Sequence, residues 1–229
     1  MVYKNMYAAK FLKRPNRFIA HCELDGEIVA AHVRNTGRLK ELLVPGAKVF
    51  LQKSDNSSRK TGYSLISVCK GEELVNIDST APNRVVFEAL KEGRLLLPGL
   101  PDLTLVKQEA KFGESRFDFY LEAGDKKAFV EVKGVTLELD NVALFPDAPT
   151  ERGTRHVEEL IKAKEEGFEA YLLFILQMRG KVFSPHTKMH PRFAEAVKKA
   201  SEKGVHVLAY DCLVDKESLT VHNPVEVVI

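Results

Sequence analysis

Two acidic residues and a lysine stand on neighbouring segments of the chain, at a spacing that could hold a divalent cation. Asp118 lies in residues 115–122, and Glu131 and Lys133 lie in residues 127–133. Both runs alternate apolar and polar side chains, and a short turn centred on Gly-Asp separates them, so together they predict a β-hairpin. The natural register of this hairpin places Asp118 directly opposite Glu131, with Lys133 two residues further along the same face.

The same register predicts one continuous apolar face on the hairpin, as a half-buried sheet requires. Three facing pairs would form it: Phe119 with Val130, Phe117 with Val132, and Leu121 with Ala128. The charged residues are then expected to share the opposite face.

Opposed carboxylates at this distance favour a bound cation. Directly facing residues of antiparallel strands have Cβ atoms roughly 4.5–5.5 Å apart, so two carboxylates there repel each other unless a positive charge lies between them. Mg²⁺ is commonly bound by one or two carboxylates and keeps several waters. Lys133 could then orient an attacking water or neutralise a phosphate oxygen. The alternative is a solvated face on which Lys133 simply pairs with both acids.

The composition is that of an ordinary globular protein. Of the 229 residues, 45% are hydrophobic and 29% are charged, and the longest apolar run, residues 171–176, is far too short to cross a bilayer. No signal-peptide apolar segment begins the sequence, and the three widely spaced cysteines favour reduced thiols over a disulfide or zinc framework. These features predict a cytoplasmic protein without a membrane partner.

The charge is unevenly distributed, although the net charge is only +2. Residues 1–80 carry 13 Lys and Arg against 8 Asp and Glu, whereas residues 81–229 carry 21 against 24. A basic first module suits attraction to a polyanion, although basic surface patches also serve solubility alone.

Residues 1–80 predict a small all-β module. Five strand-like segments follow one another without a long helix: residues 17–23, 27–33, 47–53, 63–69 and 73–78. Turn-rich segments such as residues 54–58 separate them. This pattern is typical of a five-stranded OB-like β-barrel, and such barrels bind single-stranded nucleic acids in a basic groove.

Basic side chains of the first module are its predicted nucleic-acid contacts. They are Arg14, Arg17, Arg34, Arg38, Arg59 and Lys60, with Lys13 and Lys53 as further candidates. The segment 35–38, Asn-Thr-Gly-Arg, lies at a strand end, where it either approaches a phosphate backbone or forms a plain turn.

Residues 81–229 predict an α/β module built on a mixed sheet, so that the whole chain is of the α+β class. A helix capped by Ser79 or Thr80, a strand over residues 103–112 and the hairpin come first. Helices and strands then alternate over residues 152–166, 169–177, 191–203 and 205–210. The resulting order is αβββαβαβ, a mixed sheet with helices on its faces.

This order resembles the core of the PD-(D/E)XK nuclease superfamily, which has an acid on the second strand and Glu-X-Lys on the third. The carriers here are Asp118, Glu131 and Lys133. The resemblance implies that Glu88, on the first helix, supplies a further metal ligand, unless it is an ordinary surface acid. The residue before Asp118 is Phe117 rather than the proline of the superfamily pattern.

Two literal Pro-Asp pairs occur elsewhere, at residues 101–102 and 146–147. The first precedes the sheet in a turn and the second follows the Glu-X-Lys strand, so neither lies on the partner strand of Glu131. We therefore do not expect either pair to supply the central acid, although Asp147 could join the metal site.

Nearly the whole chain is similar to the sugar fermentation stimulation protein A family. The resemblance is carried by five motifs in the same order: residues 16–20, 35–38, 113–118, 131–137 and 145–153. It implies an N-terminal OB-like barrel joined to a PD-(D/E)XK nuclease-like domain, with nucleic-acid binding as the shared theme. Members of the family are described as DNA-binding regulators of sugar utilisation.

Two functions follow as expectations. The first is a nuclease that uses Mg²⁺ or Mn²⁺, bound by Asp118 and Glu131, to hydrolyse phosphodiester bonds of DNA, single-stranded or branched. The second is a non-catalytic DNA-binding regulator that keeps the nuclease fold as a scaffold. Arg152 and Arg155, beside His156 at a helix N-terminus, are expected either to contact phosphate or to form caps and salt bridges. The sequence leaves a homodimer open.

Overall fold

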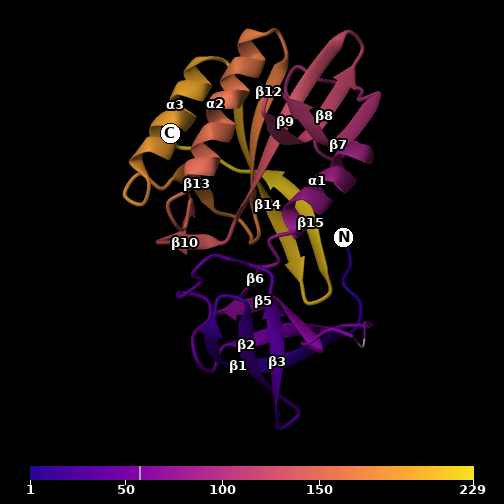
Figure 1. Ribbon diagram of the computed structural model, residues 1–229, viewed down its shortest axis with the longest axis vertical. Coiled ribbons are helices and arrows are strands. Elements are labelled where there is room, and N and C mark those ends of the chain that lie inside the picture. Colours follow the sequence, from indigo (N-terminus) through magenta and orange to yellow (C-terminus); the bar gives the residue numbers. More distant parts are fainter. Residues whose placement is uncertain (57) are drawn as a thin grey trace.

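The computed structural model describes residues 1–56 and 58–229. Ser57, part of the predicted turn at residues 54–58, lies outside the described residues. Figure 1 shows a β-barrel at one end of the molecule and a sheet covered by helices at the other. No helix of the described ranges is both long and apolar enough to cross a membrane.

The barrel is closed by five strands. They are β1 (Met6–Asn16), β2 (Ile19–Leu24), β3 (Glu27–Val33), β4 (Lys48–Lys53) and β5 (Tyr63–Lys70). They pair in the order β3-β2-β1-β4-β5, and a parallel pairing of β3 with β5 closes the circle. The sixth strand, β6 (Glu73–Asn76), extends from β5 outside the circle. The predicted five-stranded OB-like barrel is therefore confirmed.

One barrel strand was not expected, and one expected strand lies outside the closed circle. The sequence of β1 lacks the alternation of apolar and polar residues that marks a half-buried strand, and only Ala9 and Phe11 of this strand are buried. The predicted segment at residues 73–78 corresponds to β6. In the closed barrel β1 pairs with β2 and β4, although its own sequence does not predict a strand.

The second module is a six-stranded mixed sheet in the order β15-β14-β12-β9-β8-β7. Its strands are β7 (Leu105–Phe112), β8 (Ser115–Ala123), β9 (Lys126–Val135), β12 (Glu169–Leu176), β14 (His206–Asp215) and β15 (Ser218–Pro224). Its helices are α1 (Ala81–Lys91), α2 (Glu151–Glu165) and α3 (Pro191–Glu202). Strands β9, β12 and β14 run parallel, which confirms the predicted mixed sheet with helices on its faces.

Alternate residues of β12 divide the core of this module in two. Leu172 and Phe174 belong to the apolar cluster that contains the buried residues of α2 and α3, whereas Tyr171 and Leu173 belong to the cluster that contains those of α1. Successive side chains of a strand point to opposite faces, so α1 covers one face and α2 and α3 cover the other. This arrangement is visible in Figure 1.

Four strands of this module were not predicted. Three of them, β10 (Leu137–Leu139), β11 (Val142–Phe145) and β13 (Val182–Pro185), form a small separate sheet. Asp140 and Asn141, between β10 and β11, have φ of +50° and +66°, which closes a two-residue hairpin without the glycine that usually signals one. The fourth strand, β15, pairs antiparallel with β14 at the sheet edge.

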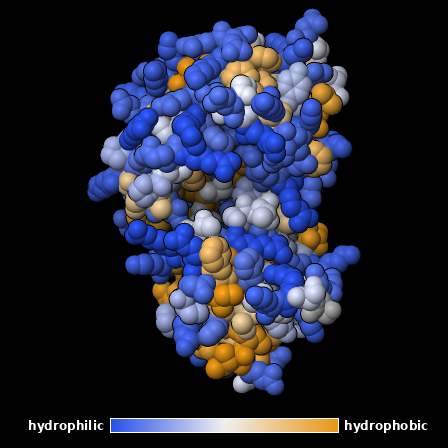
Figure 2. All heavy atoms as spheres, viewed as in Figure 1, coloured by the Kyte–Doolittle hydropathy of each residue, from blue (hydrophilic) through white to orange (hydrophobic). Residues whose placement is uncertain are grey.

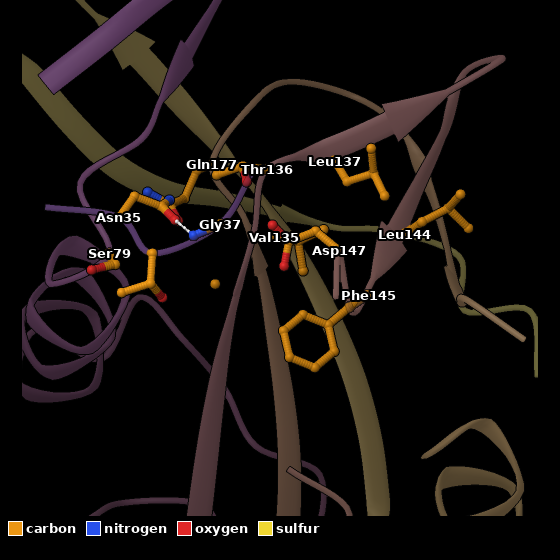
Figure 3. A pocket seen from close by; sticks show the side chains of 12 residues that line it. Asn35, Gly37, Ser79, Val135, Thr136, Leu137, Leu144, Phe145, Asp147 and Gln177 are labelled. Carbon is orange, nitrogen blue, oxygen red and sulfur yellow. Dashed lines mark hydrogen bonds between the residues drawn. The ribbon is translucent and has the colours of Figure 1, made fainter. Parts of the chain in front are cut away.

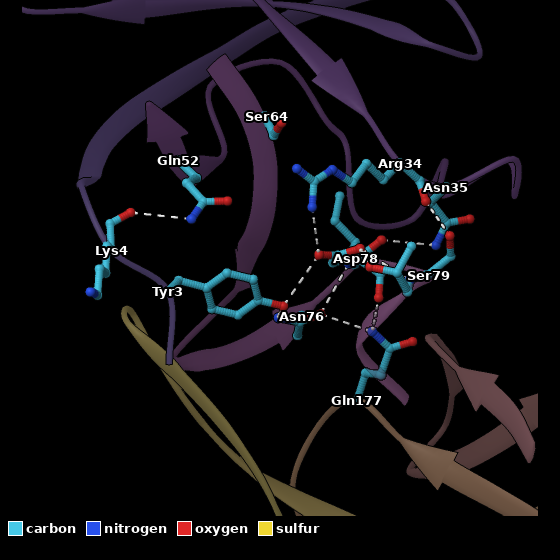
Figure 4. A network of polar contacts seen from close by, with 12 residues as sticks. Tyr3, Lys4, Arg34, Asn35, Gln52, Ser64, Asn76, Asp78, Ser79 and Gln177 are labelled. Atoms are coloured by element: carbon cyan, nitrogen blue, oxygen red, sulfur yellow. Dashed lines mark hydrogen bonds and ion pairs between the residues drawn. The ribbon is translucent and has the colours of Figure 1, made fainter. Parts of the chain in front are cut away.

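A polar network joins the two modules at their junction (Figure 4). Gln177 Nε2 donates to Asn76 Oδ1 at 2.9 Å and to the Asp78 carbonyl at 3.0 Å, while Asn76 N donates to the Gln177 carbonyl at 2.9 Å. The chain start contributes from the other side, because Tyr3 N donates to the Glu217 carbonyl at 2.7 Å. The first residues of the chain therefore pack against the second module, although the predicted boundary assigned residues 1–80 to the first.

Candidate active site

The faces of the outer strands reverse at Asp118. Phe119 stacks on Phe87 of α1 with ring centroids 6.3 Å apart, whereas Phe117 meets His156 of α2 edge-on at 6.5 Å. Residues two apart on a regular strand share a face, so these two would normally point the same way. The prediction that Phe117 shares one apolar face with Phe119 was therefore wrong.

The neighbouring strand is irregular at the same level as the reversal. Between the ladder pairs Gln108–Phe119 and Ala110–Phe117, Glu109 of β7 has φ of +56°, in the left-handed region. The β8–β9 ladder, which runs in the predicted register, ends at the pair Phe119–Val130. Asp118 is the first residue past that pair, where its carboxylate takes the place of a main-chain acceptor.

Asp118 is held from two directions. Its Oδ2 accepts a hydrogen bond from Val132 N at 2.7 Å, and its Oδ1 accepts one from Asn83 Nδ2 of α1 at 2.6 Å. Burial and the nearby charge of Glu131 raise the pKa of Asp118 to about 6, although the two hydrogen bonds and Lys133 oppose the rise. The carboxyl group is thus kept in a partly dehydrated position close to a second acid.

Glu131 is buried on the α2 face of β9. Its Oε1 lies 2.5 Å from Lys133 Nζ and 2.5 Å from His156 Nδ1. Burial alone would raise the pKa of Glu131, but the hydrogen bond to His156 and the charge of Lys133 lower it below the ordinary value. The structure therefore brings Asp118, Glu131 and Lys133 together at the point where β8 and β9 part.

The second oxygen of Glu131 tests whether this site fits a metal ion. Glu131 Oε2 is buried and has no hydrogen-bond partner among the residues that the structure describes. A buried carboxylate oxygen without a partner costs free energy unless something outside the chain satisfies it. Two carboxylates with one such oxygen fit a hard divalent cation that completes its shell with water.

Glu88, the predicted third ligand, lies elsewhere. Its Oε2 is 2.7 Å from the amino group of Met1, which also donates to the Leu219 carbonyl. Within residues 1–56 and 58–229, no group of three or more His, Cys, Asp or Glu side chains is arranged to hold a metal ion. A metal bound here would therefore have two carboxylates from the chain.

The predicted nucleic-acid contacts of the barrel divide into two groups. Arg14 donates four hydrogen bonds of 2.6–2.9 Å to the main-chain carbonyls of residues 17, 35, 37 and 38, so it serves to hold that loop. Arg34 pairs with buried Asp78 at 3.3 Å, and Arg59 donates to Ser64 Oγ. Of the eight predicted positions, five keep exposed side chains: Lys13, Arg17, Arg38, Lys53 and Lys60.

The predicted basic group on α2 is partly exposed. Arg152 and Arg155 are on the surface of its first turns, and Arg152 Nε lies 3.4 Å from His156 Nε2. The opposite ring nitrogen of His156 faces Glu131. Thr150 caps this helix by accepting from Gly153 N at 3.0 Å.

Two contacts of the site escaped the sequence analysis. Asn83 lies 35 positions before Asp118, in the first turn of α1, and no spacing rule connects an amide there to a strand acid. His156 was noted only beside Arg152 and Arg155, and its contact with Glu131 depends on how α2 packs on β9. Both side chains reach the site from helices rather than from the hairpin.

The comparisons with known proteins agree with this architecture. A family model described as "SfsA N-terminal OB domain" matches residues 12–77, and one described as "Sugar fermentation stimulation protein RE domain" matches residues 80–218. A sugar fermentation stimulation protein homolog of Clostridium beijerinckii is 50% identical over all of both chains. A homolog of Ruminiclostridium cellulolyticum is 50% identical over 99% of both chains.

One solved structure is similar over the whole chain. It is described as the structure of Pyrococcus furiosus SfsA in complex with Ca²⁺. Its TM-score is 0.88 at 31% sequence identity, and the match covers 100% of this chain and 98% of that one.

Proposed function

The chain belongs to the sugar fermentation stimulation protein family, with its OB domain and nuclease-like RE domain, and from that premise we propose that it is a divalent-metal-dependent nuclease acting on DNA. Asp118 and Glu131 would hold Mg²⁺ or Mn²⁺, and Lys133 would assist the chemistry. The Ca²⁺ described for the relative from Pyrococcus furiosus supports a divalent cation as the cofactor.

One observation carries this proposal. Among the described residues, none hydrogen-bonds the buried Oε2 of Glu131. Burial and the charge of Glu131 raise the pKa of the neighbouring Asp118 to about 6. Two buried carboxylates close together are unfavourable without a cation. A cation between them offsets their repulsion and binds the oxygen that otherwise has no partner. Arrangements of this kind, with strongly shifted pKa values, gather at functional sites.

The side chains of the site have separate tasks. A Mg²⁺ or Mn²⁺ ion held there would lower the pKa of a bound water and offset negative charge on the phosphate. Val132 N and Asn83 fix the Asp118 carboxylate, while His156 holds Oε1 of Glu131. Glu131 Oε2, which has no partner in the part of the chain that the structure describes, would then bind the ion. The Lys133 ammonium uses one proton on Glu131, so two further donors can orient a water or neutralise a phosphate oxygen.

The test is a cleavage assay with matched lysine variants. Purified protein is incubated with single-stranded, duplex and branched DNA and with RNA, in Mg²⁺, Mn²⁺ or chelator. We expect metal-dependent cleavage by the unaltered protein and by Lys127→Ala, an exposed control on the same strand. Lys133→Ala should lower the rate roughly a hundredfold or more while DNA binding is kept. If the unaltered protein binds Mn²⁺ and DNA but cleaves none of the substrates, the catalytic proposal is wrong.

A second candidate function is DNA binding without turnover, as in a regulator of sugar-utilisation genes. It is favoured by the occupation of Glu131 Oε1 by both Lys133 and His156, and by the pairing of Glu88 with the amino group of Met1. The same assay separates the two functions, because only the first predicts product. Preference for single-stranded or branched DNA, a homodimer and a cytoplasmic location stay predictions from the sequence.

A further inference from the structure

A pocket of about 180 Å³ lies where the barrel meets the second module (Figure 3). The segment 35–37 of the barrel forms one wall, and Val135, Phe145 and Asp147 lie across from it. The pocket adjoins the carboxyl ends of the parallel strands β9 and β12, the edge at which α/β sheets commonly bind ligands. In the space-filling view the surface is hollowed between the two modules (Figure 2).

Two glycines allow the walls of this pocket to approach each other. A Cβ atom at Gly37 would overlap the carboxylate of Asp147, and one at Gly134 would lie 2.6 Å from Pro82 Cγ and 2.7 Å from Gln177 Oε1. Neither glycine has a positive φ, so it is the space rather than the backbone conformation that requires them. The pocket is therefore a built feature of the junction.

Asp147 and Gln177 contribute hydrogen-bond acceptors to this pocket, which Asn35, Thr36, Ser79 and Thr136 also line. Asn35 Nδ2 and Ser79 Oγ already donate to the main-chain carbonyls of Ile77 and Arg34. Gln177 Nε2 uses its two protons on Asn76 Oδ1 and the Asp78 carbonyl, which leaves Oε1 as the free end of the amide. Asp147 offers a carboxylate, which only accepts. Burial lowers the pKa of the nearby Arg14, and the charge of Asp147 opposes that shift. The Nη protons of Arg14 are donated to main-chain carbonyls rather than to Asp147.

This chemistry selects among ligands. A phosphate is repelled by the Asp147 carboxylate. A hard cation would find a single carboxylate in this lining, against two at Asp118 and Glu131, and the side formed by Val135, Leu137 and Phe145 offers it no side-chain oxygen. A planar nucleobase uses both sides, and guanine is the base whose Watson–Crick edge presents two adjacent donors, N1–H and N2–H₂, to a carboxylate.

We propose that this pocket holds an unpaired guanine base of the nucleic acid, an inference that rests on the proposed function. Gly134, which lines the pocket, directly follows Lys133, so the base would lie about one nucleotide from the phosphate at the active site. Because the pocket uses the Watson–Crick edge, the guanine must come from a single-stranded segment or be turned out of a duplex.

The experiment measures the binding of guanosine and adenosine 5′-monophosphates by titration calorimetry, with the whole protein in chelator. Guanosine monophosphate should bind roughly tenfold to a hundredfold more tightly than adenosine monophosphate, the discrimination of a good bidentate pair. Asp147→Asn and Gly37→Ala should both remove this preference. Asp140→Asn, which makes the same charge change at an exposed position nearby, should keep it.

Other outcomes overturn the inference without touching the metal site. Equal affinity for both nucleotides, or an unchanged preference in a folded Asp147→Asn protein, shows that the pocket does not read guanine. Mn²⁺ that binds the unaltered protein and Lys133→Ala but not Asp147→Asn makes the pocket a cation site instead. Because the titration needs neither metal nor cleavage, loss of the nuclease proposal would not by itself abolish the guanine preference.

Discussion

At the scale of the residue, Asp118 carries a cost that the metal-free protein bears whenever that side chain is ionised. Its pKa is raised to about 6, against an ordinary value near 4, first by burial and then by the charge of Glu131. Above pH 6 the folded protein must hold this carboxylate charged where the unfolded chain would hold it in water. The resulting destabilisation is on the order of 3 kcal/mol.

Replacing Asp118 by Asn should therefore stabilise the metal-free protein at pH 7.5 while it destroys metal binding. The amide can accept from Val132 N through Oδ1 and donate to Asn83 once that amide turns over, so both hydrogen bonds can persist. We expect an increase in the free energy of unfolding of about 1–2 kcal/mol in chelator. Millimolar Mn²⁺ should raise the melting temperature of the unaltered protein only.

The raised pKa of Asp118 also predicts how the unfolding free energy of the metal-free protein changes with pH. Between about pH 4 and pH 6 the folded state binds more protons at Asp118 than the unfolded state, so the contribution of this group to stability falls as the pH rises through that window and is constant above it. The difference in unfolding free energy between the unaltered protein and Asp118→Asn, measured by urea denaturation in chelator, isolates the effect. A difference that stays flat from pH 4 to 7 would show that Asp118 is not dehydrated.

The hairpin pattern was sufficient to place three of these side chains close together. Alternation over residues 115–133 fixes the turn, and the structure has the same register up to Phe119–Val130. It was not sufficient for the helical contacts of Asp118 and Glu131, because Asn83 and His156 arrive through packing of separate elements on the sheet. Pairing within a hairpin is local, whereas contacts between layers are not.

At the scale of the element, the reversal of faces at Asp118 lies opposite one strained residue of β7. Glu109 has φ of +56°, which costs a residue with a side chain roughly 1–2 kcal/mol. The reversal buries Phe117 on the α2 face and leaves Asp118 between the two faces. Strict alternation cannot foresee such a residue, because Glu109 reads as an ordinary exposed position of a strand.

Substitutions at Glu109 should therefore follow backbone preference rather than charge. Glu109→Val places a β-branched side chain in the left-handed region and should lower the unfolding free energy by about 1–2 kcal/mol, whereas Glu109→Gly should be neutral or slightly stabilising. Urea denaturation of both variants measures the effect. Lys107→Val, an exposed position on the same strand with a residue of the same branching, serves as the control. Equal stability of the two Glu109 variants would mean that the strand can be regular there.

The barrel gives the opposite lesson about elements. Turn signals such as Asp25-Gly26, where both residues have positive φ, were enough to predict β2 and β3. The strand β1 joins β2 and β4 in the closed circle but exposes most of its side chains. Such a strand can be recognised from its hydrogen-bonded partners in the structure, but not from the apolar pattern of its own sequence.

At the scale of the whole molecule, one charge that looked available for nucleic acid, that of Arg34, is used at the junction of the modules. Asp78 is fully buried at the junction and pairs with Arg34, while Tyr3 OH and the Thr80 hydroxyl also reach its carboxylate (Figure 4). A count of basic residues in the first module cannot separate such a partner from a surface contact. The exposed Arg38, by contrast, is free to meet a phosphate.

Arg34→Met and Arg38→Met should therefore have different consequences. Arg34→Met leaves a buried carboxylate without its cation, so we expect the unfolding free energy to fall by about 3 kcal/mol, with the salt dependence of DNA binding unchanged. Arg38→Met should leave stability within about 0.5 kcal/mol and reduce the slope of log affinity against log salt by about 0.7–0.9, the release of one phosphate contact. Urea denaturation and fluorescence anisotropy with labelled DNA at several salt concentrations measure both effects. If Arg34→Met is fully stable but reduces the salt slope, Arg34 contacts nucleic acid after all. The junction would then depend on other contacts.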